Sequence, residues 1–418
     1  MSRSDTADVV IVGGGAAGLA AAIFCGRTLP DRRILCIDGA RSIGAKILVS
    51  GGGRCNVTNR TVRETDFWGG DRRVIRNVLR AYPAERAAAL FDELGVTLHA
   101  EDDGKLFPDS NRARTVLDAL VRGVNDAGAE LQVSRRIEAV ERTDNDFSVR
   151  SADGREIKTG ILVLATGGRS LPKTGSDGHG YALARTLGHG YVATTPALTP
   201  LVLGDGLHRD LAGASHPAVV TVQAEDAAPV RLAGAMLWTH FGVSGPVVLN
   251  ASRHWLRARL EGRRVALRLN VFPGTTFSDL DDWLQEQQRS HPRALVRTVI
   301  ASRLPASVAS AVVLAADLDP AIGMAHLTRD DRRRLVAMAL EMPLDAVDSR
   351  GYNYAEVTSG GIPLSEIDSA TMESRVCPRL FLIGEILDVD GRIGGFNFQW
   401  AWSSAWVASS AIARTLRA

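Results

Sequence analysis

Near its start the chain alternates between short apolar runs and glycine-rich turns. Asp8–Gly13 is a continuous β-branched run, which is typical of a central parallel strand buried on both faces. The apolar stretch Leu19–Phe24 predicts a helix, and Arg33–Asp38 predicts a second strand that ends in a carboxylate. This order of strand, turn, helix and strand predicts the opening of an α/β domain with a Rossmann-like sheet.

The turn between the first strand and the helix carries glycines at the spacing GxGxxG. We expect Gly13 to permit the tight turn, Gly15 to let the backbone approach a pyrophosphate, and Gly18 to allow close packing of helix and strand. Asp38 follows Gly18 by 20 residues and can accept hydrogen bonds from a ribose diol. The helix N-terminus would add unpaired N–H groups and a positive dipole for the phosphates. A turn that serves packing alone is the alternative, but the combined spacing favours a dinucleotide site.

Two later strands favour FAD over NAD as the dinucleotide. Ile161–Gly168 is a hydrophobic strand that ends in Ala-Thr-Gly-Gly, where small residues let the chain pass close to a ligand. Leu380–Glu385 is another buried strand, and we expect its acid, Glu385, to hold the ribityl hydroxyls. After Gly394-Gly395 a helix runs to about residue 416, and its N-terminal dipole would stabilise reduced flavin. A strand and helix that return at the carboxyl terminus predict a discontinuous FAD-binding domain.

A second glycine-rich segment runs from Ser50 to Asn59. Its three consecutive glycines can form an anion-binding nest, and Arg54 adds a permanent charge that would neutralise the pyrophosphate. Asn56 and Thr58 would hydrogen-bond the edge of the flavin ring. The alternative is a flexible loop with a helix cap at Asn56 or Thr58. Lys46 either binds phosphate or substrate or is simply solvated, and Cys55 is expected to be an inert thiol.

The middle of the chain interrupts the FAD-binding pattern. Residues 196–276 mix short alternating segments with turn residues, which predicts an inserted β-rich substrate domain, and residues 277–344 have the periodicity of a small helical subdomain. The FAD-binding domain would then comprise 1–195 and 345–418. We expect the insertion to shape the substrate cavity, since binding sites favour domain interfaces.

Candidate acid–base groups are few. His240 is the first candidate for catalysis and His179 the second, although a lone histidine is more often structural. The sequence shows no nucleophile–base pairing, zinc-ligand spacing or Walker loop, so no metal is expected. An arginine run between 253 and 268 predicts either a solvated surface or an RNA contact.

Composition narrows the classes of protein. The chain has 418 residues, of which 49 are basic and 47 acidic, so a broad cationic face for nucleic acid or lipid is not expected. Four cysteines without metal-ligand spacing suit a reducing cytoplasm. The uncharged stretch Val9–Gly26 is long enough to cross a membrane, but its glycines favour a strand, a turn and a buried helix. Oligomeric state is not indicated.

Several motifs resemble the BaiN/RdsA family of NAD(P)/FAD-dependent oxidoreductases. The matching stretches are Gly44–Asn59, Gly104–Pro108, Trp238–Pro246, Val357–Gly361, Thr371–Ser374 and Gly384–Ser404. The resemblance implies non-covalent FAD, a Rossmann-like FAD domain with an inserted β-rich domain and a small helical piece. Family members are similar to an aminoacetone oxidase and to flavoproteins proposed to reduce double bonds in steroid acids. Phe396, Arg375 and Ala405-Trp406 depart from the usual family residues, which leaves the substrate and the electron partner open.

These observations predict an FAD-dependent oxidoreductase that transfers hydride between flavin N5 and a small organic substrate. An NAD(P)H-linked reductase is the first interpretation, with NAD(P)H as a transient donor. A peroxide-producing amine oxidase, a tRNA-modifying flavoprotein and a flavin sensor are the alternatives. The candidate cofactor contacts are Gly13, Gly15, Ala16, Ala17, Gly18, Asp38, Gly39, Lys46, Ser50, Gly51, Gly52, Gly53, Arg54, Asn56, Thr58, Ile137, Ala165, Thr166, Gly167, Gly384, Glu385, Asp388, Gly394, Gly395, Phe396 and Asn397.

Overall fold

The computed structural model describes residues 5–204 and 206–417 and divides into two compact units. The first unit comprises residues up to Pro196 and from Glu356 onward, and the second comprises Ala197–Ala355. The first unit therefore resumes at Glu356 and not at 345, because the strand between these positions, Ala346–Ser349, pairs within the sheet of the second unit.

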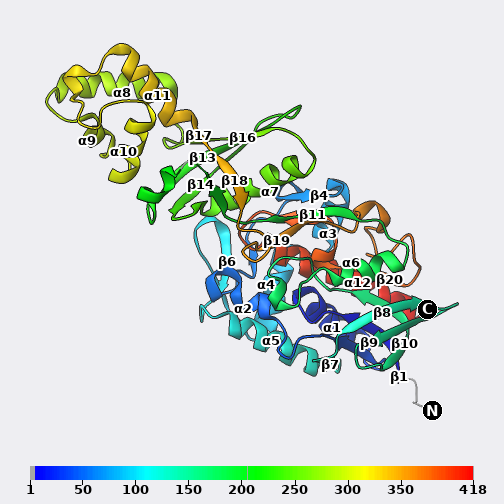
Figure 1. Cartoon of the computed structure of the whole chain (residues 1–418). Coiled ribbons are helices and arrows are strands. Elements are labelled where there is room, and N and C mark those ends of the chain that lie inside the picture. Colours follow the sequence, from blue (N-terminus) through cyan, green and yellow to red (C-terminus); the bar gives the residue numbers. More distant parts are fainter. Residues whose placement is uncertain (1–4, 205, 418) are drawn as a thin grey trace. The chain divides into compact units, whose positions relative to one another are not determined.

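The first unit is built on a seven-stranded sheet in the order β7-β2-β1-β10-β9-β8, with β20 also paired to β10 (Figure 1). Its main strands are β1 (Asp5–Val12), β2 (Ile34–Ile37), β7 (Glu130–Gln132), β8 (Ile137–Arg142), β9 (Phe147–Ser151), β10 (Glu156–Leu164) and β20 (Leu380–Leu382). Strands β7, β2, β1, β10 and β20 are parallel, whereas β8 and β9 add an antiparallel meander. This is the doubly wound arrangement that the apolar runs predict.

Helices cover the sheet of the first unit. The long carboxyl-terminal helix α12 packs against α1, which also contacts α5, so the two ends of the chain share one core. The helices are α1 (Ala16–Thr28), α2 (Ala45–Gly53), α3 (Arg72–Ala81), α4 (Ala84–Glu93), α5 (Ala113–Asp126), α6 (His179–Thr186) and α12 (Phe396–Arg417). Burial of the alanine-rich faces of α1 and α12 explains the close approach of these helices.

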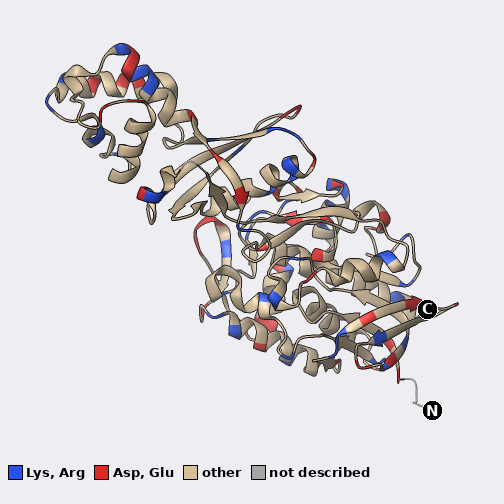
Figure 2. Cartoon of the chain, in the orientation of Figure 1, with Lys and Arg blue, Asp and Glu red and all other residues tan. Residues whose placement is uncertain are grey.

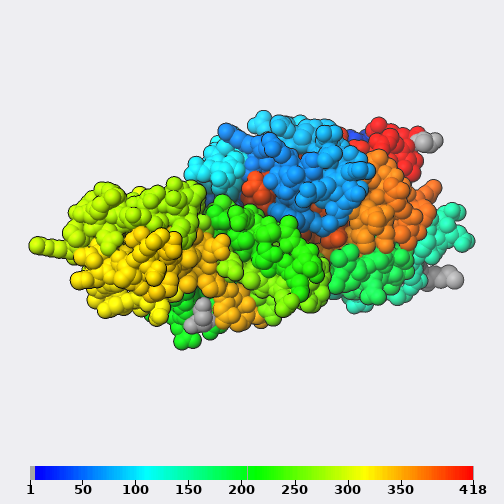
Figure 3. All heavy atoms as spheres, turned by 90° about the horizontal axis from the view of Figure 1, so that it is seen from above, coloured from blue at the N-terminus to red at the C-terminus, as the bar shows by residue number. Residues whose placement is uncertain are grey.

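Short strand pairs join distant segments of the first unit. In one small sheet, β6 (Lys105–Pro108) lies between β3 (Thr58–Asn59) and β5 (Leu98–Ala100). Two further pairs are β4 (Phe67–Gly69) with β21 (Val389–Gly391) and β11 (Val192–Ala197) with β19 (Val357–Gly361). The pairing of β4 with β21 places early residues directly beside the carboxyl-terminal tail. In Figure 3 the blue surface of the early residues accordingly lies next to orange and red surface from the last part of the chain.

The second unit has an antiparallel sheet and a helical part. The sheet order is β17-β16-β13-β14-β15-β12-β18. Its strands are β12 (Leu201–Leu203), β13 (Ser215–Ala224), β14 (Val230–Thr239), β15 (Gly242–Ser244), β16 (Val265–Asn270), β17 (Met342–Leu344) and β18 (Ala346–Ser349). Its helices are α7 (Pro246–Leu260), α8 (Phe277–Ser290), α9 (Val296–Ile300), α10 (Ala306–Ala315) and α11 (Arg329–Glu341). Capping boxes at Thr276 and Thr328 fix the starts of α8 and α11.

Candidate functional site

Four parallel strands of the first unit end at one edge of the sheet. The turns that follow them are Gly13–Gly18 after β1, Asp38-Gly39 after β2, Ala165–Gly167 after β10 and Gly384-Glu385 after β20. Backbone hydrogen bonds tie these turns together, from Gly13 N to Ile37 O (2.8 Å) and from Ala165 N to Val12 O (2.9 Å). In open α/β sheets, ligands bind at the carboxyl ends of the strands. The predicted segments therefore meet at the edge where a dinucleotide fits.

The three fingerprint glycines have different surroundings. A Cβ on Gly13 would lie 2.4 Å from Ala165 O, and its φ of +111° favours glycine. A Cβ on Gly18 would lie 1.8 Å from Gly13 O, so this position requires close packing. A Cβ on Gly15 would meet nothing within 4 Å. Gly15 thus leaves open space at the start of α1, where Ala16 and Ala17 form the first turn, and this space fits a pyrophosphate.

The edge also carries polar groups that suit a nucleoside. Asp38 accepts hydrogen bonds from Gly14 N (2.6 Å) and Ala40 N (2.7 Å), which orients its carboxylate and leaves further lone pairs for a ribose. Gly39 lies close to Arg136, beside the buried Ile137 at the start of β8.

Two hydroxyls near the same turns have no protein partner. The Oγ1 of Thr166 and the Oγ of Ser176 are buried and unpaired among the described residues. A Cβ on Gly167 would lie 2.9 Å from the Ser176 Oγ, so the two segments are in contact. Buried hydroxyls are normally hydrogen-bonded. Their lack of a protein partner is what a site shaped for a polar cofactor predicts.

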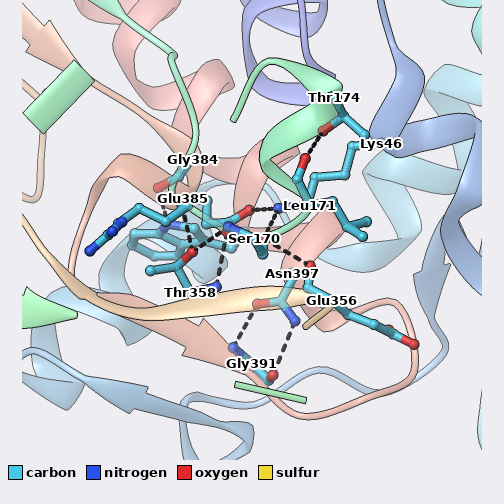
Figure 4. A network of polar contacts seen from close by, with 12 residues as sticks. Lys46, Ser170, Leu171, Thr174, Glu356, Thr358, Gly384, Glu385, Gly391 and Asn397 are labelled. Atoms are coloured by element: carbon cyan, nitrogen blue, oxygen red, sulfur yellow. Dashed lines mark hydrogen bonds and ion pairs between the residues drawn. The ribbon is translucent and has the colours of Figure 1, made fainter. Parts of the chain in front are cut away.

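A polar network joins α2 to the segment after β20 (Figure 4). Lys46 forms an ion pair with Glu385 and donates to the Oγ of Ser170. Glu385 also accepts from the Ser170 Oγ (2.9 Å) and from Thr358 N (2.9 Å). The structure thus pairs Lys46 with an acid, whereas the sequence left it between a ligand role and solvation.

Two members of this network were missed by the sequence reasoning. The Oγ1 of Thr358 accepts hydrogen bonds from Arg169 N (2.7 Å) and Ser170 N (3.0 Å), and both Ser170 and Thr358 are fully buried. Thr358 lies in the Val357–Gly361 motif, which was identified but given no role. Ser170 follows the Ala-Thr-Gly-Gly turn closely, and this position in the sequence could have indicated that it lies at the site.

The second glycine loop makes its own contacts within the protein. Gly51, Gly52 and Gly53 all have positive φ, between +55° and +83°. Ser50, which precedes them, donates to Ile47 O (2.7 Å). Arg54, however, forms a bidentate pair with Glu101 (2.5 and 3.2 Å).

The Arg54 guanidinium also lies 4.0 Å from the centre of the Phe107 ring. The hydrogen bonds from Arg54, aided by its charge, lower the pKa of the Glu101 carboxyl. Because its charge is compensated here, the geometry gives no support to neutralisation of a pyrophosphate by Arg54.

Asn56 and Thr58 join two distant parts of the chain. With its amide oriented by its hydrogen-bond partners, Asn56 accepts from Gly395 N (3.1 Å) and donates to Thr58 O (2.8 Å). Thr58 donates from Oγ1 to Gln399 Oε1 (2.6 Å). A Cβ on Gly395 would lie 2.5 Å from the Thr58 carbonyl. These side chains therefore help to close the discontinuous domain, and their predicted hydrogen bonds to the flavin edge stay a prediction.

The carboxyl-terminal tail is held by its own contacts. The Asn397 amide accepts from Gly391 N (2.7 Å) and donates to Gly391 O (3.0 Å), while Asp388 O accepts from Gly70 N (2.8 Å). Gly384, Gly394 and Gly395 all have positive φ. These contacts fix the tail where it enters α12.

Two aromatic side chains of the tail pack within the protein. Phe396 is fully buried against Phe67, with ring centres 6.1 Å apart. Trp406 stacks on Tyr82 (5.3 Å). Both rings thus contribute to packing within the protein, and a contact of Phe396 with the cofactor stays a prediction.

The histidine candidates lie in different units. His240 follows β14 in the second unit, is exposed, and meets the Phe241 ring edge to face at 5.1 Å. His179 begins α6 in the first unit, and its backbone N–H donates to Asp177 (3.0 Å). A catalytic role for His240 stays a prediction.

A further histidine, His189, is held between Glu366 (2.7 Å) and the Ser374 Oγ (2.8 Å). The Ser374 Oγ also accepts from Val376 N and Cys377 N, so this triad, in which His189 and Ser374 are buried, is structural.

Half of the six arginines in the run form ion pairs with acids. Three of its members pair with carboxylates, Arg263 with Glu261, Arg264 with Glu225 and Arg268 with Glu341. Figure 2 shows that acidic and basic residues are interspersed over the chain. Paired arginines are poor phosphate ligands, so the solvated-surface interpretation fits better.

The described residues contain neither a metal-binding cluster nor a membrane-spanning helix. No group of three or more histidine, cysteine or acidic side chains there is arranged to hold a metal ion. Among the described helices, none has the length and apolar character needed to cross a membrane.

Comparison with known proteins places the chain in a family. Residues 7–411 match the HI0933-like protein Rossmann domain. The chain is 32% identical over 405 residues to a ribosomal RNA dihydrouridine synthase of Escherichia coli, covering 96% of this chain and 97% of the relative. It is 30% identical to a 3-dehydro-bile acid delta(4,6)-reductase of Clostridium scindens, and the match covers 96% of this chain and 98% of the relative.

Solved structures show the same fold. A flavocytochrome c3 fumarate reductase in an open conformation superposes with a TM-score of 0.50 at 16% identity, covering 99% of this chain and 79% of that chain. This likeness and the family match confirm the predicted FAD-binding Rossmann fold. The chain belongs to the HI0933-like family of FAD-dependent oxidoreductases.

Proposed function

We propose that this flavoenzyme is a reductase of carbon–carbon double bonds conjugated to a carbonyl group, and that its substrate is a uracil ring in RNA. The observation that carries the proposal is the 32% identity, over nearly the whole chain, to a ribosomal RNA dihydrouridine synthase. The bile acid reductase relative also has a name that describes double-bond reduction next to a ketone. The two relatives thus share one reaction type on different substrates.

This proposal revises the expectation of a small-molecule substrate without nucleic acid. A near-zero net charge excludes a broad cationic face but does not exclude a local contact. An enzyme that modifies one nucleotide needs only a few phosphate contacts, since the base itself is read in a pocket.

The reaction balances with a hydride and a proton. The turns at Gly15 and Asp38 would hold FAD, which would supply a hydride once a nicotinamide donor has reduced it. The substrate accepts this hydride at the carbon β to its carbonyl, and the α carbon then takes up a proton, so the double bond becomes a single bond. In uridine these carbons are C6 and C5, and the product is dihydrouridine.

The residues of the first unit fit the cofactor in distinct ways. Gly15 leaves room for the pyrophosphate, and Asp38 presents an oriented carboxylate to the ribose. The buried hydroxyl of Thr166, which has no partner among the described residues, can hydrogen-bond a polar group of the cofactor. Lys46 and Glu385 hold α2 against the segment after β20. We propose that this ion pair fixes the two sides of the flavin site.

An anaerobic reoxidation experiment tests the proposal. The purified holoenzyme is bleached with NADH or NADPH under argon, and uridine-containing RNA, a steroid enone or a primary amine is then added. Return of the yellow absorbance with RNA supports the proposal. Return with the steroid enone alone supports the second candidate, which the bile acid reductase relative favours. Failure of both donors to bleach the flavin, together with bleaching by the amine, would identify an oxidase.

A further inference from the structure

An arginine in the second unit is held between two aromatic rings. The guanidinium carbon of Arg350 lies 4.4 Å from the centre of the Phe241 ring and 3.9 Å from that of Tyr354. We call these three residues the Arg350 cluster. Both rings lie within the range in which a cation and an aromatic face attract each other. Arg350 itself is half-buried, whereas Tyr354 is 53% exposed.

The backbone fixes the Arg350 cluster. Arg350 N donates to Pro200 O (2.9 Å) at the start of β12, and Leu203 N at the other end of that strand donates to Phe241 O (3.1 Å). A tight turn closed by Tyr354 N to Gly351 O (3.1 Å) folds the tyrosine back onto the arginine. The side chain is therefore held in place before any ligand arrives.

The side-chain N–H donors of Arg350 meet no acceptor in the part of the chain that the structure describes. Among residues 5–204 and 206–417, no carboxylate forms an ion pair with its guanidinium, and no oxygen accepts a side-chain hydrogen bond from it. This sets Arg350 apart from Arg263, Arg264 and Arg268, which are all paired with acids. A guanidinium has five N–H donors in one plane, and these donors need an acceptor.

The geometry limits which ligand can bind. Because two rings lie close to the guanidinium, stacking of a further planar group on it is restricted and its in-plane N–H donors remain. These donors form the fork that matches a phosphate or a carboxylate. The half-exposed Tyr354 adds a surface on which an unpaired base can stack.

We propose that the Arg350 cluster binds a backbone phosphate of the RNA strand whose uridine is reduced. This inference rests on the proposed function, which supplies RNA as the substrate class. The same donors would also fit the 2′-phosphate of NADPH, so the test must separate these two sources of phosphate. An arginine held by aromatic contacts alone keeps its full charge for the ligand.

The test measures RNA binding by the oxidised holoenzyme, without turnover. A fluorescent, uridine-rich single-stranded RNA is titrated with wild type, Arg350→Ala and Arg350→Lys at several salt concentrations. Arg303→Ala is the matched control. Arg303 lies over the Trp283 ring at 4.1 Å in the same unit, and its replacement removes the same charge. Flavin content and melting temperature check that each variant is folded.

We expect Arg350→Ala to weaken RNA binding about tenfold and to reduce the salt slope by about 0.7, the value for one phosphate contact of a single strand. Arg350→Lys should be intermediate, since it keeps the charge but loses the fork. Arg303→Ala should match wild type. RNA affinity that is equal in Arg350→Ala and Arg303→Ala would overturn the inference.

A rise in the KM for NADPH but not for NADH in Arg350→Ala, with unchanged RNA affinity, would also overturn it and assign the cluster to the nicotinamide donor. Either result leaves RNA reduction by the wild-type enzyme intact. Absence of RNA reduction in the wild type is the separate result that would overturn the proposed function.

Discussion

Lys46 and Glu385 form an ion pair across 339 positions of sequence. Their side chains are 27% and 18% exposed, so the pair is shielded from solvent more than an ordinary surface salt bridge. It connects the start of α2 with the segment after β20, which are two of the segments that a discontinuous FAD-binding domain must bring together.

A double-mutant cycle on this pair should show strong coupling. Lys46→Met leaves the Glu385 carboxylate without its cation, and Glu385→Gln leaves the Lys46 ammonium without its anion. Each single variant should lower the free energy of unfolding by about 2 kcal/mol, and the double variant by less than the sum, since it leaves no uncompensated charge. Urea denaturation of the holoenzyme measures these values. Additive effects would show that the pair contributes no coupling energy.

Gly15 and Gly18 should respond in opposite ways to alanine. The free energy of unfolding of Gly15→Ala should lie within about 0.5 kcal/mol of the wild-type value. The variant should nevertheless bind FAD at least about tenfold more weakly, because the added methyl group enters the space for the pyrophosphate. Gly18→Ala should fail to fold, since its Cβ would lie 1.8 Å from Gly13 O. Melting curves and FAD titration of the apoprotein check both. Wild-type FAD affinity in Gly15→Ala would contradict the position assigned to the pyrophosphate.

Gly395→Ala should open the discontinuous domain. Its φ is +91°, and the added Cβ would lie 2.5 Å from the Thr58 backbone, so we expect a loss of at least about 3 kcal/mol of stability and release of flavin. Gly175→Ala is the control, because Gly175 has a φ of +100° but no atom within 4 Å of the added Cβ. It should cost only the backbone strain of about 1–2 kcal/mol. Equal losses in the two variants would show that the contact with Thr58 is unimportant.

Arg54→Ala should leave FAD binding nearly unchanged. Because Arg54 pairs with Glu101 and stacks on Phe107, we expect its removal to change the FAD dissociation constant less than about threefold, within the effect of an ordinary surface substitution. Fluorescence titration of the apoprotein with FAD measures the constant. A loss of a hundredfold would restore the pyrophosphate role that the loop composition predicts.

The cysteines should resist alkylation in the native protein. Burial raises the pKa of the Cys36 and Cys55 thiols to about 12 and that of Cys25 to about 11, and Cys377 is also buried. A raised pKa keeps these groups as thiols up to high pH, so iodoacetamide at pH 8 should modify none of them until denaturant is added. Mass spectrometry counts the modified residues. Rapid modification of Cys55 in the folded holoenzyme would reveal a reactive thiol.

The sequence was sufficient to predict the elements that follow local rules. The run Asp8–Gly13, the fingerprint glycines and the final helix are specified by apolar patterning and by glycine spacing. The protein partners of Arg54, Asn56 and Thr58 could not be predicted, because these partners lie on segments that only the tertiary fold brings near. The Arg350 cluster had no signal of its own, since Phe241 and Tyr354 are more than a hundred residues apart and neither lies in a charged motif.

Mass spectrometry of RNA tests the central claim most directly. Unmodified ribosomal RNA is incubated with the holoenzyme and NADPH under argon, digested to nucleosides and examined for uridine that has gained two hydrogens. We predict that dihydrouridine forms only when enzyme and reduced nicotinamide are both present. RNA that remains unmodified while the flavin is fully reduced would contradict the assignment of an RNA uracil as the substrate.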